Sequence, residues 1–136
     1  MEQVLADTHY WIAVIDTMDP WHGAARAAKE RAMPATLVTT DEVLVEVLNA
    51  FSGRGMYLRD VATRFVFRLK RDTGVQIVEQ SRASFDRGLI LYDARHDKGY
   101  SLVDCISMNT MHRLEIDRVL TNDRHFAQEG FQVLMT

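Results

Sequence analysis

Short apolar runs alternate with longer amphipathic segments along the chain. Apolar or β-branched runs of a few residues predict buried strands, and apolar residues three or four positions apart predict helices. The predicted strands are Val4–Ala6, Thr36–Thr40, Val75–Val78, Val119–Thr121 and Phe131–Leu134. The predicted helices are His9–Ile15, Trp21–Ala32, Val43–Phe51, Leu58–Asp72, Ser81–Tyr92 and Ser101–Leu114, with a helical turn after Asp123. This alternation predicts a three-layer α/β/α fold with a mainly parallel, doubly wound sheet.

The sequence predicts a single domain over residues 1–136, because it has no internal repeat and no Ser-, Pro- or Gly-rich linker. The chain has 47% hydrophobic and 26% charged residues, a composition that excludes a disordered or collagen-like protein. No apolar stretch approaches the roughly 20 residues that cross a bilayer. The N-terminal MEQVLAD lacks the basic and apolar regions of a secretory signal. The single cysteine, Cys105, cannot form an internal disulfide and favours a cytoplasmic location.

Two aspartates lie just after predicted strands. Asp7 follows Val4–Ala6, and Asp123 follows the VLTN segment that begins at Val119. Ligands of open α/β sheets bind at the carboxyl ends of the strands, so both are candidate ligand positions. Each aspartate alone could instead cap the helix that follows it. We favour that interpretation for Asp41, as a cap, and for Glu42, as a first-turn acid.

Two further carboxylates interrupt apolar helix faces. Glu46 is the only polar residue between Val43 and Leu48, although it could pair with an arginine, and Asp104 shares a helical face with Met108. Gathering four carboxylates inside a fold is unfavourable, because each loses hydration and repels the others, unless a cation lies between them. Mg²⁺ and Mn²⁺ bind carboxylate oxygens together with substrate phosphates. The pattern therefore predicts metal-assisted phosphodiester chemistry.

Several segments in a fixed order carry a family resemblance. They read VLADTHYWIAVID from Val4, DPWHGAA from Asp19, TTDEVLVEVLNAF from Thr39, YSLVDCISM from Tyr100 and VLTNDRHF from Val119. Together they resemble the PIN-domain ribonucleases, in particular the VapC-type toxins of toxin–antitoxin pairs. The resemblance runs from about Val4 to Phe131, which is nearly the whole chain.

The resemblance implies an acidic quartet at the carboxyl ends of the strands, made of Asp7, Glu46, Asp104 and Asp123. It further implies cleavage of RNA that depends on Mg²⁺ or Mn²⁺, a small antitoxin partner that blocks the groove, and a homodimer. The sequence departs from the family at His9, where a smaller residue is usual, and at Tyr100, where tryptophan is frequent. Both departures bear on the shape of the groove.

Roles for the quartet and its neighbours follow as hypotheses. The expected metal ligands are Asp7, Asp104 and Asp123, directly or through water. Glu46 is expected to orient or deprotonate the attacking water, or to act as an outer ligand. Thr8 and Asn122 match polar positions of the family and are expected to hydrogen-bond a ligand carboxylate or the phosphate.

An arginine-rich stretch lies between Gly53 and Asp72, where six basic residues face two acidic ones. Arg64, Arg68 and Arg71 share one predicted helical face, and we expect them to contact RNA, because guanidinium groups donate two hydrogen bonds to a phosphate. A solvated helix face, an antitoxin contact or a subunit contact are the alternatives.

Other functions are compatible with the sequence. One is a housekeeping or DNA-directed nuclease with this fold and no antitoxin, and another is an inactive binding module. A phosphotransfer receiver domain is disfavoured, because Lys98 is the only lysine in the last third of the chain. No glycine-rich phosphate loop, HExxH helix or paired-cysteine zinc motif occurs, and Cys105 is expected in the core.

The net charge of −3 argues against binding of nucleic acid through bulk positive charge. Leaving out the four quartet acids, however, the chain carries 16 basic against 15 acidic residues. The excess of acids therefore lies in the predicted metal site, where bound cations would attract phosphate. Net charge alone does not exclude an RNA substrate.

Overall fold

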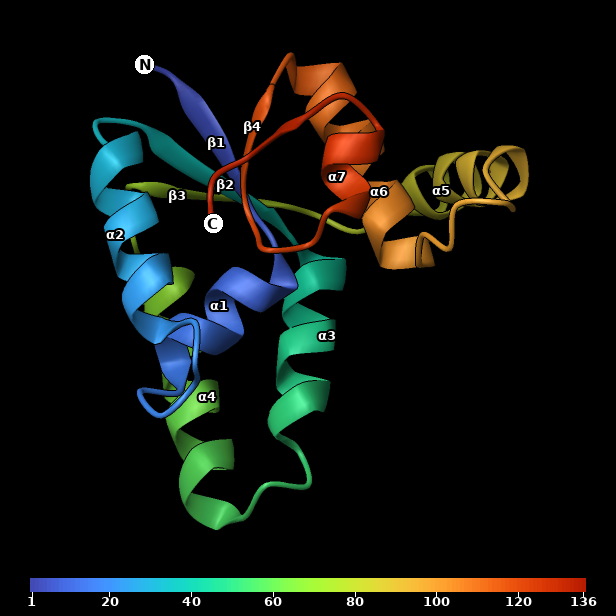
Figure 1. Ribbon diagram of the computed structural model, residues 1–136. Coiled ribbons are helices and arrows are strands. Elements are labelled where there is room, and N and C mark those ends of the chain that lie inside the picture. The colour runs from blue at the N-terminus through green and yellow to red at the C-terminus, as the bar shows by residue number, and fades with distance from the viewer.

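A five-stranded, all-parallel sheet is the middle layer of the computed structural model, which describes residues 1–136 (Figure 1). The strands lie in the order β3-β2-β1-β4-β5. They are β1 (Gln3–Ala6), β2 (Thr36–Thr40), β3 (Val75–Val78), β4 (Arg118–Leu120) and β5 (Gln132–Val133). The chain moves outward from β1 in one direction through β2 and β3, and in the other through β4 and β5. This reversal confirms the predicted doubly wound α/β fold and places a topological switch between β1 and β4.

Helices cover both faces of this sheet. The seven are α1 (Thr8–Ile15), α2 (His22–Ala32), α3 (Asp41–Phe51), α4 (Met56–Leu69), α5 (Arg82–Ala94), α6 (Leu102–Leu114) and α7 (His125–Gln128). Two hydrophobic cores result: one joins β1 to the first four helices, and the other lies beneath α6 and α7. Val4 and Ala6 belong to the first core and Leu5 to the second, as the alternation of side chains along a strand requires. None of these helices combines the length and the apolar composition that spanning a bilayer requires.

Three helix starts differ from the sequence-based expectation. Thr40, not Asp41, caps α3, because its hydroxyl accepts a hydrogen bond from the Val43 N–H at 3.0 Å. The carboxylate of Asp7 occupies the cap position of α1 but accepts no capping hydrogen bond, which leaves it available for other contacts. The helix predicted over Leu58–Asp72 begins earlier and ends at Leu69. It starts at Met56, directly after Gly55, whose φ of +93° suits glycine.

Candidate active site

Three of the four predicted acids converge at the carboxyl edge of the sheet. Asp7 follows β1, and its backbone N–H donates to the Leu120 carbonyl at 3.1 Å, so the ends of β1 and β4 lie side by side. Asp123 lies just after β4. Asp104 is in the first turn of α6, where its carboxylate accepts a hydrogen bond from the Ser101 N–H at 3.0 Å. Asp7 and Asp104 are buried, and Asp123 is half-buried.

Thr121 links two of these acids. Its hydroxyl is fully buried, accepts a hydrogen bond from the Asp123 N–H at 3.1 Å and donates to Oδ2 of Asp7 at 3.0 Å. Oδ1 of Asp7 is buried as well and has no hydrogen-bond partner. Thr121 was not among the predicted site residues, because a threonine at the end of a strand carries no signal beyond its β propensity.

The electrostatics of the site reflect crowded negative charge. Burial, together with smaller contributions from the charges of Asp7 and Asp123, raises the pKa of Asp104 to about 6, against the lowering effect of its hydrogen bonds with Ser101. Pairing with Asp7, whose Oδ2 lies 3.8 Å from Nδ1 of His9, raises the pKa of His9. Asp123 and Asp104 add smaller contributions in the same direction. These effects indicate that the three aspartates are close enough to interact electrostatically.

Glu46 lies beside this group. It projects from α3 and accepts a hydrogen bond from the hydroxyl of Thr8, the first residue of α1 and the neighbour of Asp7. Glu46 is half-buried. Thr8 therefore contacts the predicted quartet, but through Glu46 rather than through an aspartate. Asn122 is half-buried between Thr121 and Asp123, and its side chain makes no hydrogen bond to the acids.

The predicted RNA-contacting arginines are not brought to the acids. Arg64 and Arg68 lie on α4, and Arg71 lies in the turn that leads into β3. This turn is at the amino edge of the sheet, where the Leu37 N–H of β2 donates to the Gly74 carbonyl, and the acids are at the carboxyl edge. The three arginines line a shallow cleft with Phe67, but Arg64 pairs with Asp60 at 3.2 Å.

The donor set fits a divalent cation. Oxygen atoms of Asp104 and Asp123 and a ring nitrogen of His125 lie within 4.8 Å of one another. Beside them, the buried Oδ1 of Asp7 and Nδ1 of His125 lack hydrogen-bond partners. Buried polar atoms are rarely left unpaired, and a cation would satisfy both. The residues that could hold it are therefore Asp7, Asp104, Asp123 and His125.

The sequence matches the PIN domain family over residues 4–131. The chain belongs to the PIN-domain family. This membership confirms the resemblance found in the sequence and agrees with the position of the three aspartates. A search among curated proteins found no match.

Two solved structures share this fold. VapC20 of Mycobacterium tuberculosis, a toxin that cleaves the sarcin–ricin loop, superposes with a TM-score of 0.84 at 21% sequence identity, over 94% of this chain and 95% of that one. A toxin–antitoxin complex from Klebsiella pneumoniae gives a TM-score of 0.61 at 19% identity, over 89% of this chain and 87% of that one. At these identities the likeness establishes the fold.

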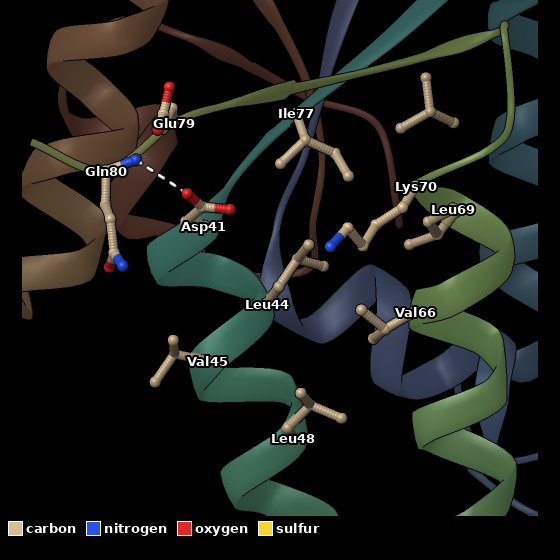
Figure 2. Close-up of a pocket in the computed structure, with 11 residues that line it drawn as sticks. Asp41, Leu44, Val45, Leu48, Val66, Leu69, Lys70, Ile77, Glu79 and Gln80 are labelled. Atoms are coloured by element: carbon tan, nitrogen blue, oxygen red, sulfur yellow. Dashed lines mark hydrogen bonds between the residues drawn. The ribbon is translucent and has the colours of Figure 1, made fainter.

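This PIN domain also has an apolar groove between α3, α4 and the edge strand β3 (Figure 2). It has a volume of about 670 Å³, and most of its lining is aliphatic: Leu44, Val45, Leu48, Val66, Leu69, Val75 and Ile77. Asp41 borders one end and accepts a hydrogen bond from the Gln80 N–H at 2.9 Å. Lys70 extends its amine toward the aliphatic residues (Figure 2). The groove contains none of the quartet acids.

Proposed function

We propose that this PIN domain is a metal-dependent endoribonuclease and the toxin of a toxin–antitoxin pair, acting in the cytoplasm. The observation that carries the proposal is the group of three aspartates, with an unpartnered Asp7 oxygen, at the carboxyl edge of a PIN-family sheet. A solved toxin that cleaves the sarcin–ricin loop shares the fold, and so does a chain of a solved toxin–antitoxin complex. Cys105 is buried and unpaired, as is usual in the cytoplasm.

The residues of the chain supply binding, orientation and proton transfer. Asp7, Asp104 and Asp123 would hold Mg²⁺ or Mn²⁺. When bound, such a cation lowers the pKa of water and stabilises negative charge on the departing oxygen of a phosphodiester. Thr121 fixes the carboxylate of Asp7 in one orientation through its hydrogen bond.

Glu46 is the proposed proton acceptor. It lies beside Thr8, is half-buried, and receives one hydrogen bond at Oε1, so its other oxygen remains able to orient or deprotonate a water molecule. Asn122 remains a candidate donor to the substrate phosphate, because its side chain makes no hydrogen bond to the neighbouring acids.

Cleavage of defined substrates tests this function. Purified protein with Mg²⁺ or Mn²⁺ should cut structured RNA, including a hairpin with the sarcin–ricin loop sequence, and leave matched DNA intact. Excess chelator and the Asp104→Asn variant should abolish cleavage. Preferential cutting of DNA would favour the DNA-directed alternative. Equal cutting by the variant, or no cutting with either metal, would overturn the proposal.

We further propose that the groove between α3 and α4 binds the antitoxin. A groove lined by aliphatic side chains suits a segment with apolar residues at regular spacing, and Lys70 suits an acidic group on that segment. Asp7 precedes α1 and Asp41 begins α3, and both lie at the carboxyl edge of the sheet. An antitoxin segment that lies in the groove and continues past Asp41 would therefore approach the acids.

A homodimer is the second proposed assembly. α5 buries only Gly88, where an added Cβ would lie 2.6 Å from Cγ1 of Ile106, so this helix packs closely against α6. The same helix exposes large apolar residues: Phe85, Leu89, Ile90 and Tyr92. An exposed apolar surface of this kind favours self-association. Analytical ultracentrifugation should give a dimer for the unmodified chain and a monomer for Ile90→Glu.

A further inference from the structure

His125 has an unusual position relative to the acids. It begins α7, and its backbone N–H donates to Oδ1 of Asp123 at 2.9 Å, which holds the ring beside that carboxylate. Nδ1 of His125 lies 3.2 Å from the same Oδ1 and 3.7 Å from Oδ2 of Asp104. Nδ1 is buried, and neither contact satisfies the geometry of a hydrogen bond.

The surroundings fix which ring nitrogen faces the acids. The ring of Tyr100 lies 5.4 Å from the imidazole, centre to centre, at an angle of 60°. Tyr100 is itself held, because its hydroxyl donates to Glu129 at 3.0 Å and Glu129 pairs with Arg95. Nε2 of His125 lies on the side of Gly99, where an added Cβ would be 3.8 Å away. Nδ1 therefore points toward the carboxylates with its orientation largely set by the fold.

An unpartnered nitrogen between two carboxylates needs a positive charge. If Nδ1 carries a lone pair, it faces the negative oxygens of Asp104 and Asp123 and is repelled by them. The three atoms lie within 4.8 Å of one another, which allows each to bind the same ion. A cation placed there would receive two oxygens and one nitrogen.

From this geometry we infer that His125 is a direct nitrogen ligand of the divalent cation, and that the centre consequently prefers Mn²⁺ to Mg²⁺. The inference rests on the proposed metal-dependent function and extends it to the choice of ion. Mg²⁺ is a hard cation that keeps oxygen ligands, whereas imidazole binds first-row transition-metal ions more readily. A site of three carboxylates alone would not make this distinction.

Pulsed electron paramagnetic resonance of Mn²⁺ bound to the whole protein tests the inference without reference to catalysis. The unmodified chain should show electron spin-echo modulation from a directly bound ¹⁴N nucleus. His125→Gln should lose this modulation and bind Mn²⁺ at least about tenfold more weakly, while its affinity for Mg²⁺ changes little. His9→Gln is the matched control, since His9 also lies near Asp7 but should leave the modulation intact.

Several results would overturn the inference. The first is the absence of ¹⁴N modulation in the Mn²⁺-loaded unmodified chain. The second is a loss of the modulation in His9→Gln but not in His125→Gln. The third is the absence of Mn²⁺ binding at millimolar concentration. The first result would assign His125 to an ion pair with Asp123. A failure of the proposed ribonuclease function is a separate outcome: Mn²⁺ would bind with ¹⁴N modulation, but RNA would not be cut.

Discussion

The hydroxyl of Thr121 donates a hydrogen bond to Oδ2 of Asp7 at 3.0 Å and accepts one from the backbone N–H of Asp123 at 3.1 Å. One side chain thus sets the relative positions of two candidate metal ligands, which come from the ends of two adjacent strands. Residues that orient a ligand carboxylate in this way commonly contribute ten- to a hundredfold to metal affinity.

Thr121→Val should therefore weaken Mn²⁺ binding by roughly tenfold or more. Valine keeps the shape of threonine but lacks the hydroxyl, so neither oxygen of Asp7 retains a hydrogen-bond partner. Thr121→Ser restores the hydroxyl and is the matched control, with affinity close to that of the unmodified chain. Isothermal titration calorimetry measures all three proteins. Equal affinity of the valine variant would show that Thr121 does not orient Asp7.

Asp104→Asn should stabilise the metal-free protein at high pH while abolishing cleavage. The pKa of Asp104 is about 6 in the fold, against 3.8 as its ordinary value. The folded state therefore binds more protons than the unfolded state between these values, and the free energy of unfolding falls as the pH rises from about 4 to 6. A shift of this size corresponds to about 2–3 kcal/mol. Asparagine is uncharged and can still accept the hydrogen bond from the Ser101 N–H.

Urea denaturation in excess chelator measures this effect. The free energy of unfolding of the variant should exceed that of the unmodified chain by about 2 kcal/mol at pH 8. The difference should be small at pH 4, where Asp104 is protonated in the folded state and about half protonated in the unfolded state. A variant that is less stable at pH 8, or that gains equally at both pH values, would contradict the assigned cause. Added Mn²⁺ should reverse the order at pH 8, because only the unmodified chain keeps the full ligand set.

Glu46→Gln should lower the rate of RNA cleavage by about a hundredfold or more, which is the usual loss when a general base is removed. Glu42 offers a matched control one turn earlier on α3: it accepts a hydrogen bond from the Ser84 hydroxyl at 3.0 Å and lies outside the acidic group. Glu42→Gln should cleave RNA at nearly the unmodified rate. Single-turnover kinetics with saturating RNA separates this chemical step from binding. Similar losses of cleavage rate in both variants would show that the substitutions disturb the structure of α3 and would contradict a role of Glu46 as general base.

The sequence was sufficient to predict the fold because the hydrophobic pattern constrains it closely. The strand Val4–Ala6 alternates between two cores, and the helix Ser101–Leu114 was expected one residue from its observed start. Asp7 and Asp123 followed from the same logic, since residues after parallel strands share one edge of the sheet. Asp104 followed from helical periodicity, because it interrupts an otherwise apolar face of its helix.

Features that depend on the directions of whole helices were harder to predict. Helical periodicity was enough to predict that Arg64 and Arg68 share one face of α4. Their distance from the acids, however, depends on where α4 joins the sheet. The orientation of His125 depends on Tyr100 and on a hydrogen bond within its own turn, and neither leaves a spacing pattern in the sequence. Thr121 was missed for a similar reason, because its role arises from the pairing of β1 with β4.

Arg64, Arg68 and Arg71, here called the arginine stripe, remain a proposed RNA contact, and their position makes the expectation more specific. Since the row of Arg64, Arg68 and Arg71 leads along α4 to a turn at the amino edge, it would hold RNA away from the bond that is cut. Arg64→Ala with Arg68→Ala should weaken RNA binding and reduce its dependence on salt, with little change in the single-turnover rate at saturating RNA. Arg113→Ala, an exposed arginine at the end of α6, is the control. Unchanged affinity would reassign the stripe to a protein contact.

Val45→Arg should separate antitoxin binding from catalysis. Val45 lines the groove between α3 and α4, and 52% of its surface is exposed, so arginine can be accommodated without unfolding the helix. The added charge and bulk should prevent an apolar segment from entering the groove and weaken binding at least tenfold. The probe is the product of a short reading frame next to this gene, co-purified with the chain. Asn49→Arg, an exposed position one turn later on α3, is the matched control. RNA cleavage by both variants should equal that of the unmodified chain, and retained binding by Val45→Arg would place the antitoxin elsewhere.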